Sequence, residues 1–153
     1  MSKIVVVPVV IDTNVLVPSV FMRSYILKFI LKGNIAPVWS DFIFNEALEI
    51  TERLWDKSYQ KKMEPEQLPE TIELLETIYH YFGYPIDDEM PEDWPPVSRD
   101  RKDDPFLWAA ETGKAEYIIS HDRRHMLELG NHKGIPIGTP AEFFQWVKAA
   151  HPM

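Results

Sequence analysis

Ile4-Val5-Val6-Val7-Pro8-Val9-Val10-Ile11-Asp12-Thr13-Asn14 is the stretch of sequence that decides the fold. Residues 4–11 are an almost unbroken β-branched run, which is typical of a strand buried on both faces of a parallel sheet. Pro8 has no N–H to donate to a neighbouring strand, so the core strand can shrink to residues 9–11, with an edge or a bulge before it. The run stops at three polar residues, Asp12, Thr13 and Asn14.

The rest of the chain alternates between helical and strand patterns without internal repeats. Strands are expected at residues 35–39, 116–120 and 135–137, and helices at residues 20–31, 41–55, 70–82, 104–113, 124–129 and 139–150. Ser40 is placed to cap the second helix, and Thr139-Pro140-Ala141-Glu142 has the form of a capping box. Residues 83–98 contain four prolines and an acidic run, which predicts a loop with room for one short strand. This order predicts an α/β protein, a three-layer α/β/α sandwich with a mainly parallel central sheet.

Composition sets further limits. The 153 residues suit one domain, covering residues 1–153, and the absence of cysteine excludes disulfides, thiolate zinc sites and a thiol nucleophile. No apolar run is long enough to span a bilayer, so the expected location is cytoplasmic and no membrane partner is expected. Lys and Arg total 16 and Asp and Glu total 24, a net charge of −8, which argues against a module that only binds nucleic acid. A nuclease whose carboxylates are neutralised by divalent cations remains compatible with this charge.

Acidic residues follow the expected strands. Asp12 comes after the first strand and Asp122 after the strand at residues 116–120, while Glu46 and the pair Asp103-Asp104 lie on helices near strand ends. Parallel sheets bind ligands at the carboxyl ends of their strands. Carboxylates gathered there would repel one another and favour Mg²⁺ or Mn²⁺, which prefer oxygen ligands. Each acid also has an ordinary interpretation as a helix cap, a turn residue or a solvated side chain, and periodicity alone does not choose between these interpretations.

Four segments, taken together, resemble a known family. Val10-Ile11-Asp12-Thr13-Asn14-Val15-Leu16 is similar to the opening motif of PIN-domain ribonucleases, and Glu46, within Phe44-Asn45-Glu46-Ala47-Leu48, falls where that family carries its second acid. Residues 99–107, Arg-Asp-Arg-Lys-Asp-Asp-Pro-Phe-Leu, resemble the third acidic motif. Residues 109–111 and 115–122 resemble the helix and strand that lead to the fourth. The similarity runs over nearly the whole chain in the family's order, and the most similar subgroup is the toxin–antitoxin type, with VapC-like toxins.

The resemblance implies an endoribonuclease that hydrolyses RNA with Mg²⁺ or Mn²⁺, the toxin of a toxin–antitoxin pair, with an antitoxin partner and a homodimer as family-level expectations. By position it makes Asp12, Glu46, Asp103 and Asp122 the catalytic and metal-binding acids. Asp104 competes with Asp103 as the third acid, because the motif aligns one residue either way. It also implies that Thr13 or Asn14 orients Asp12 or binds phosphate, and that Ser120 stands where the family often has threonine. Substrate contacts are therefore expected at Thr13, Asn14, Ser120, Arg101 and Arg123, although the two arginines equally fit solvated positions beside acids.

Two other functions compete with the ribonuclease. One is a non-catalytic protein with the same fold that binds a partner through its acidic surface. The other is a phosphatase with Asp12 as the nucleophile, but that chemistry normally needs a second aspartate two residues later, and position 14 is asparagine. The chain also departs from the family at His121, where a glycine usually precedes the last acid, and this change can alter the backbone or add a nearby base.

Overall fold

The computed structural model describes residues 6–152, and its central feature is a six-stranded sheet in the order β3-β2-β1-β4-β6-β5. All neighbouring strands run parallel except β5, which is antiparallel to β6. The strands are β1 (Val7–Ile11), β2 (Ile35–Trp39), β3 (Tyr84–Pro85), β4 (Tyr117–Ile119), β5 (Asn131–His132) and β6 (Ile135–Gly138).

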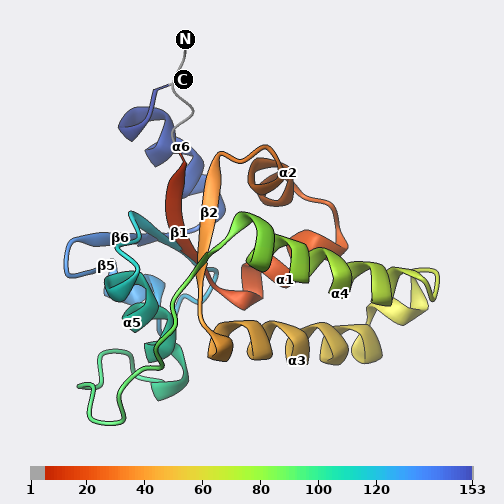
Figure 1. Cartoon of the computed structure of the whole chain (residues 1–153), viewed down its shortest axis with the longest axis horizontal. Helices are drawn as coiled ribbons and strands as arrows, with labels where there is room; N and C mark the ends of the chain where they lie inside the picture. Colours follow the sequence, from red (N-terminus) through yellow and green to blue (C-terminus); the bar gives the residue numbers. More distant parts are fainter. Residues whose placement is uncertain (1–5, 153) are drawn as a thin grey trace.

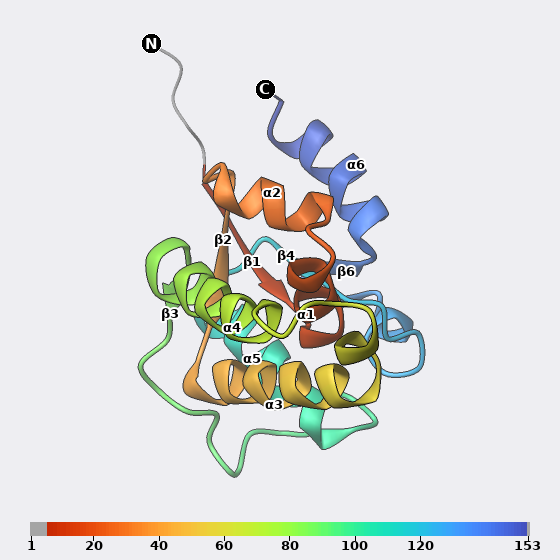
Figure 2. The same cartoon turned by 90° about the vertical axis from the view of Figure 1, so that its right-hand side faces the viewer.

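Helices cover both faces of the sheet and complete the three-layer α/β/α sandwich that the alternating pattern predicts. Figure 1 shows α5 on one side of β1 and β2, with α1, α2 and α4 on the other, and in Figure 2 α3 and α4 lie side by side. The α-helices are α1 (Thr13–Phe21), α2 (Tyr25–Leu31), α3 (Asp41–Lys57), α4 (Gln67–Thr77), α5 (Asp104–Thr112) and α6 (Pro140–Ala150). Short 3₁₀ segments η1 (Tyr59–Lys61), η3 (Arg101–Asp103) and η4 (Leu127–Leu129) and a π-helical segment η2 (Ile78–Phe82) complete the chain.

Strand β1 tolerates a proline at the centre of the sheet because of where its neighbour begins. The β1 run is a strand from Val7 onward, so it is longer than residues 9–11, and residues 4 and 5 of the expected strand lie outside the described residues. The backbone N–H of Val7 donates to the carbonyl of Asn34, which precedes β2. The carbonyl of Pro8 points the other way and accepts from the backbone N–H of Glu116, which precedes β4. The nitrogen of Pro8 therefore faces β4's side at a level where β4 has not yet started, since Val9 pairs with Tyr117, the first residue of β4.

The prediction of a single helix at residues 20–31 is wrong. The chain forms α1 directly after Asp12 and then turns by 89° into α2. Arg23 between them has a positive φ of 52°, which ends one helix and redirects the chain. Within residues 6–152, no single helix is long and apolar enough to span a membrane. The bent pair α1 and α2 reaches that length and hydropathy only when the two helices are counted together. Most side chains of this pair are buried in the core.

The other elements follow the sequence closely, apart from two helices and the unexpected strand β5. The helix expected at residues 70–82 begins earlier, at Gln67, and changes to π geometry from Ile78 to Phe82. The helix expected at residues 124–129 is a series of turns with only the short η4. The loop at residues 83–98 does hold one short strand, β3, and the capping box of Thr139 and Glu142 is present.

The sheet topology places the carboxyl ends of β1 and β4 side by side. From β1 the chain crosses to β2 on one flank, while β4 pairs with β1 on the other flank. This reversal of strand order is where open parallel sheets form their ligand sites. The residues after β1 and β4 are Asp12 and Ser120, and they therefore meet although the chain separates them by 108 positions.

Candidate active site

Asp12 is held rigidly at the end of β1. It is 6% exposed, and its backbone N–H continues the ladder by donating to Ile119 of β4. The Ser120 hydroxyl donates to Oδ2 of Asp12 at 2.8 Å and accepts from the backbone N–H of Asp122 at 3.0 Å. One buried hydroxyl thus fixes the first acid and also the start of the loop that carries the last acid.

Glu46 approaches from α3. The Ser40 side chain caps this helix by accepting from the N–H of Ile43, and Glu46 follows on the second turn. Thr13, buried directly after Asp12, donates its hydroxyl to Oε2 of Glu46 at 2.9 Å. Thr13 therefore orients Glu46, whereas the sequence-based expectation was that it orients Asp12 or contacts substrate.

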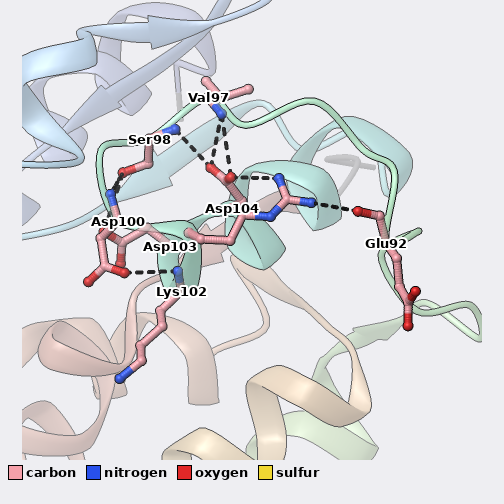
Figure 3. Close-up of polar contacts among 8 residues, drawn as sticks. Glu92, Val97, Ser98, Asp100, Lys102, Asp103 and Asp104 are labelled. Carbon is pink, nitrogen blue, oxygen red and sulfur yellow. Dashed lines mark hydrogen bonds and ion pairs between the residues drawn. The ribbon is translucent and has the colours of Figure 1, made fainter.

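Asp103 and Asp104 are adjacent in sequence but face different surroundings (Figure 3). Asp103 is partly exposed, and burial, followed by the charges of Asp12 and Asp122, raises its pKa. Asp104 is fully buried and accepts from the backbone N–H of Ser98 at 2.8 Å and from the guanidinium of Arg101 at 2.9 Å. Of the two aspartates, Asp103 is the one that belongs to the carboxylate cluster.

The contacts of Asp104 clamp the proline-rich loop onto the start of α5. Arg101 donates to Asp104 with one nitrogen and to the carbonyl of Glu92 with the other, at 3.3 Å. The expectation that Arg101 contacts substrate is therefore not supported by its position, because its guanidinium is already shared between a buried carboxylate and the loop. Ser98 adds a contact to the cluster itself, since its hydroxyl lies 3.4 Å from Oδ2 of Asp103.

The cluster of Asp12, Glu46, Asp103 and Asp122 has the electrostatics expected of crowded acids. Burial raises the pKa of Asp12 to about 6, with the charges of Glu46 and Asp122 acting in the same direction and the Ser120 hydrogen bond opposing them. Burial, followed by the charges of Asp12 and Asp122, also raises the pKa of Asp103 to about 6. Burial raises the pKa of Glu46 as well, against the hydrogen bond from Thr13. Neighbouring carboxyl groups with raised pKa values are typical of functional sites.

The comparison with protein families agrees with the resemblance found in the sequence motifs. A family model described as PIN domain matches residues 8–124, a span that contains all four acids of the cluster. The chain belongs to the PIN-domain family. No curated protein and no solved structure matches it. PIN domains are generally nucleases and usually work with divalent metal ions.

The acids of this PIN domain fit a divalent cation by chemistry more than by their present spacing. Within residues 6–152, no group of three or more acidic or histidine side chains is close enough to form a ready-made metal site. The donors are all carboxylate oxygens, which suit Mg²⁺ and Mn²⁺. Asp12 is fixed, while Glu46, Asp103 and Asp122 are only partly buried and can adjust around it.

Asp122 has a second task in the PIN domain. Its Oδ1 accepts from the backbone N–H groups of Arg124 at 3.1 Å and His125 at 3.2 Å, so the interpretation of Asp122 as a turn cap is confirmed. Its charge also reaches Asp12 and Asp103. Its neighbour His121 is exposed and has no positive φ, so the missing glycine causes no backbone strain.

Some of the residues expected to contact substrate are buried and others are exposed. Ser120 is fully buried, so the expectation that it contacts substrate is wrong; it orients Asp12 instead. Asn14 and Arg123 are exposed beside the acids and stay predicted contacts. A groove of about 610 Å³ opens next to Glu46, between α3, the start of α5 and residues 89–90, and its lining includes Phe42, Arg53 and Lys102.

Sequence reasoning missed one contact and two residues of this region. Thr13 as the partner of Glu46 and Ser98 as a neighbour of Asp103 depend on contacts between distant segments, which no spacing reveals. The third is Tyr79, a fully buried tyrosine whose pKa is raised by burial and then by the charges of Glu46 and Asp12. Its helical spacing marked it only as a core residue.

Proposed function

We propose that this PIN domain is a metal-dependent endoribonuclease whose reaction centre is the cluster of Asp12, Glu46, Asp103 and Asp122. The observation that carries the proposal is the assembly of these four acids at the carboxyl ends of β1 and β4, two of them with pKa values near 6. Repelling carboxylates are costly to keep together unless a cation neutralises them.

The protein groups have separable tasks in this proposal. Asp12 is the fixed ligand, since Ser120 holds one of its oxygens, and Glu46 is the second oriented ligand, since Thr13 holds one of its oxygens. Asp103 and Asp122 complete the donor set on the open side of the cluster. Mg²⁺ or Mn²⁺, when bound there, supplies Lewis-acid activation of water and neutralises charge on the scissile phosphate.

Substrate access is supported by the groove next to Glu46. Glu46 is the one acid of the cluster in its lining, and the side chains of Arg53 and Lys102 provide positive charge among further acids of the same lining. Phosphate contacts of this kind position a strand without reading its sequence. Phe42, at 43% exposure, offers a surface for base stacking at the same groove.

The deciding experiment compares wild type with Asp12→Asn on a fluorescent single-stranded RNA in Mn²⁺. We expect wild type to cleave and EDTA to stop cleavage. Asp12→Asn should lose at least a hundredfold in rate while it remains cooperatively folded, because a carboxylate in contact with the reacting groups is replaced by a neutral isostere. Full activity in Asp12→Asn, or cleavage that EDTA does not reduce, would falsify the proposal.

The same material tests the non-catalytic alternative, an interaction protein that uses its acidic surface. Calorimetric titration of wild type with Mn²⁺ separates the two functions, because the nuclease requires binding at the acid cluster and the interaction protein does not. A folded wild type that neither binds Mn²⁺ nor cleaves RNA favours the interaction protein.

We also propose that the ribonuclease acts as the toxin of a toxin–antitoxin pair in the cytoplasm. The support is the resemblance of the four motifs to that subgroup. Induced expression of wild type should arrest growth of a bacterial host, whereas Asp12→Asn should not. Equal growth under both inductions would remove the toxin role and leave the nuclease assignment in place.

A further inference from the structure

The segment between Asp12 and α3 carries positive charge and no negative charge. Residues 13–40 contain Arg23, Lys28 and Lys32 but no aspartate or glutamate, in a chain whose net charge is −8. All three cations are exposed, on α2 or just before or after it. None of them forms an ion pair with an acid among residues 6–152. Their charge is therefore available to a ligand of opposite sign.

The same stretch exposes large apolar side chains. Every exposed residue from Met22 to Lys32 is either cationic or apolar, and Met22, Tyr25 and Leu31 are 62%, 67% and 41% exposed. The ring of Tyr25 meets that of Phe144 on α6 edge to face, with centroids 5.2 Å apart and an interplanar angle of 86°. This arrangement leaves at least one face of the tyrosine ring open. Exposed apolar groups that gather on one surface are typical of interaction sites.

Helix α6 extends this surface. Lys148 is exposed and lies one helical turn after Phe144, so the two side chains project from the same face of α6. The one acid of α6, Glu142, is held in the capping box by the backbone N–H of Thr139. Figures 1 and 2 both place α2 and α6 at the end of the molecule opposite α3, the helix of Glu46. The α2–α6 surface is defined by five exposed residues, Arg23, Tyr25, Lys28, Lys32 and Lys148.

The arrangement of charge on α2 favours single-stranded RNA over a membrane. A helix that lies on a membrane gathers its apolar side chains into one strip that enters the bilayer. On α2 the apolar strip is buried in the core instead, and on the exposed side Tyr25, Lys28 and Leu31 alternate between apolar and charged. Single strands are bound by cations that contact phosphates, together with aromatic rings that stack on bases. Lys28 and Lys32 lie about 6 Å apart on adjacent turns, which suits two phosphates of one strand.

We propose that the α2–α6 surface is a second RNA-binding site, which holds a single strand outside the reaction centre. The nine residues of α1 lead from Asp12 to this surface and span about 14 Å. A strand that reaches both places must be several nucleotides long, so the surface favours long substrates over a dinucleotide. Its effect on cleavage rests on the proposed function, whereas the binding of RNA to the surface does not.

The first test measures RNA binding by fluorescence anisotropy in EDTA, with a labelled single strand of about 20 nucleotides. The double variant Lys28→Gln/Lys32→Gln should bind this strand roughly tenfold more weakly than wild type, because two phosphate contacts are lost. For the same reason the slope of log affinity against log salt concentration should become shallower by about 1.4. Tyr25→Ala should weaken binding about fivefold or more, and Tyr25→Phe, which keeps the stacking ring, should restore most of that loss.

The matched control is Lys61→Gln/Lys62→Gln, which removes the same charge from exposed lysines beyond the end of α3. We expect this pair to bind RNA as wild type does. An equal loss in both lysine pairs would reduce the effect to net charge and overturn the proposal. Unchanged RNA binding in Lys28→Gln/Lys32→Gln would also overturn it, and a loss of binding to phosphatidylserine vesicles in that variant would then assign the surface to a membrane.

The second test measures cleavage in Mn²⁺ on the long strand and on a dinucleotide. The ratio of kcat/KM for the long strand to kcat/KM for the dinucleotide should fall roughly tenfold in Lys28→Gln/Lys32→Gln, as the lost phosphate contacts require, and should match wild type in the control pair. If wild type cleaves RNA but both lysine pairs have the same ratio, the second site is overturned and the proposed function stands. If wild type cleaves nothing but loses RNA binding in Lys28→Gln/Lys32→Gln, the proposed function is overturned and the binding surface is supported.

Discussion

At the scale of single residues, two adjacent aspartates have opposite tasks. Asp103 lies in the acid cluster, whereas Asp104 holds Ser98 and Arg101 from a fully buried position. The sequence motif aligned with either of them, because it carries no information on which carboxyl faces the loop. The clamp of the proline-rich loop, which depends on the backbone of Val97 and Ser98, decides between them.

Exchanging each aspartate for asparagine should separate these tasks. Asp104→Asn leaves Arg101 without its charged partner, so the free energy of unfolding should fall by about 1–3 kcal/mol. Asp103→Asn should leave stability unchanged or higher and should lower the rate of RNA cleavage by at least tenfold. Chemical denaturation and a cleavage assay check both variants. A stability loss in Asp103→Asn together with an unimpaired Asp104→Asn would show that the assignments are reversed.

Some residues of the site could be identified from the sequence and others could not. Asp12, Glu46, Asp103 and Asp122 are marked by their positions after strands and on helices, and by the family motifs. Thr13 and Ser120 were expected near the site, but their acceptors were not, because each hydrogen bond joins segments that only the folded sheet brings together. Tyr79 carries no sequence signal, since a tyrosine at core spacing normally belongs to the core.

At the scale of elements, local chemistry predicts most boundaries. Ser40, the capping box of Thr139 and Gly113 at the end of α5 were all readable from residue type. The break between α1 and α2 was not, because no glycine or proline marks it and an arginine adopts the positive φ. The expected helix at residues 124–129 is reduced to turns and the short η4, although the Asp122 side chain accepts from the N–H groups of Arg124 and His125 as a helix cap would.

Helix caps provide a test of how α3 serves the site. Ser40→Ala and Thr139→Ala each remove a side-chain cap, so each should lower the free energy of unfolding by about 1 kcal/mol. Of these two helices, α3 carries an acid of the cluster, Glu46, and α6 carries none. We therefore expect Mn²⁺ affinity to fall several-fold in Ser40→Ala and to stay unchanged in Thr139→Ala. Calorimetry on both variants checks this, and equal affinity losses would mean that α3 has no special part in the site.

At the scale of the whole molecule, the acid cluster makes stability depend on pH. The pKa of Asp12 is about 6 in the folded protein, compared with its ordinary value of 3.8. Between these values the folded state binds more protons than the unfolded state, so the free energy of unfolding falls as pH rises from about 4 to about 6. Asp103 acts in the same direction.

Asp12→Asn removes the contribution of Asp12 to the pH dependence of stability. The difference in the free energy of unfolding between this variant and wild type therefore measures that contribution. In EDTA at pH 7.5 the variant should be more stable than wild type by about 1–3 kcal/mol, and the difference should shrink toward pH 4. Saturating Mn²⁺ should reverse the order, because the metal stabilises only the protein that binds it. Urea unfolding at several pH values measures this. The exposed Asp56 on α3, changed to asparagine, is the control, and a gain of equal size there would point to net charge alone.

The pairing of β1 with β4 also has a consequence during synthesis. Asp12 leaves the ribosome early, but its partner Ser120 follows only 108 residues later, and the strand that brings them together is made near the end of the matched region. Contacts of such long sequence separation form late in folding. A nascent chain that ends before β4 has every residue of the first three acidic motifs and still lacks the assembled cluster. We therefore expect a cell that makes this protein to be exposed to its activity only when translation of the domain is almost complete.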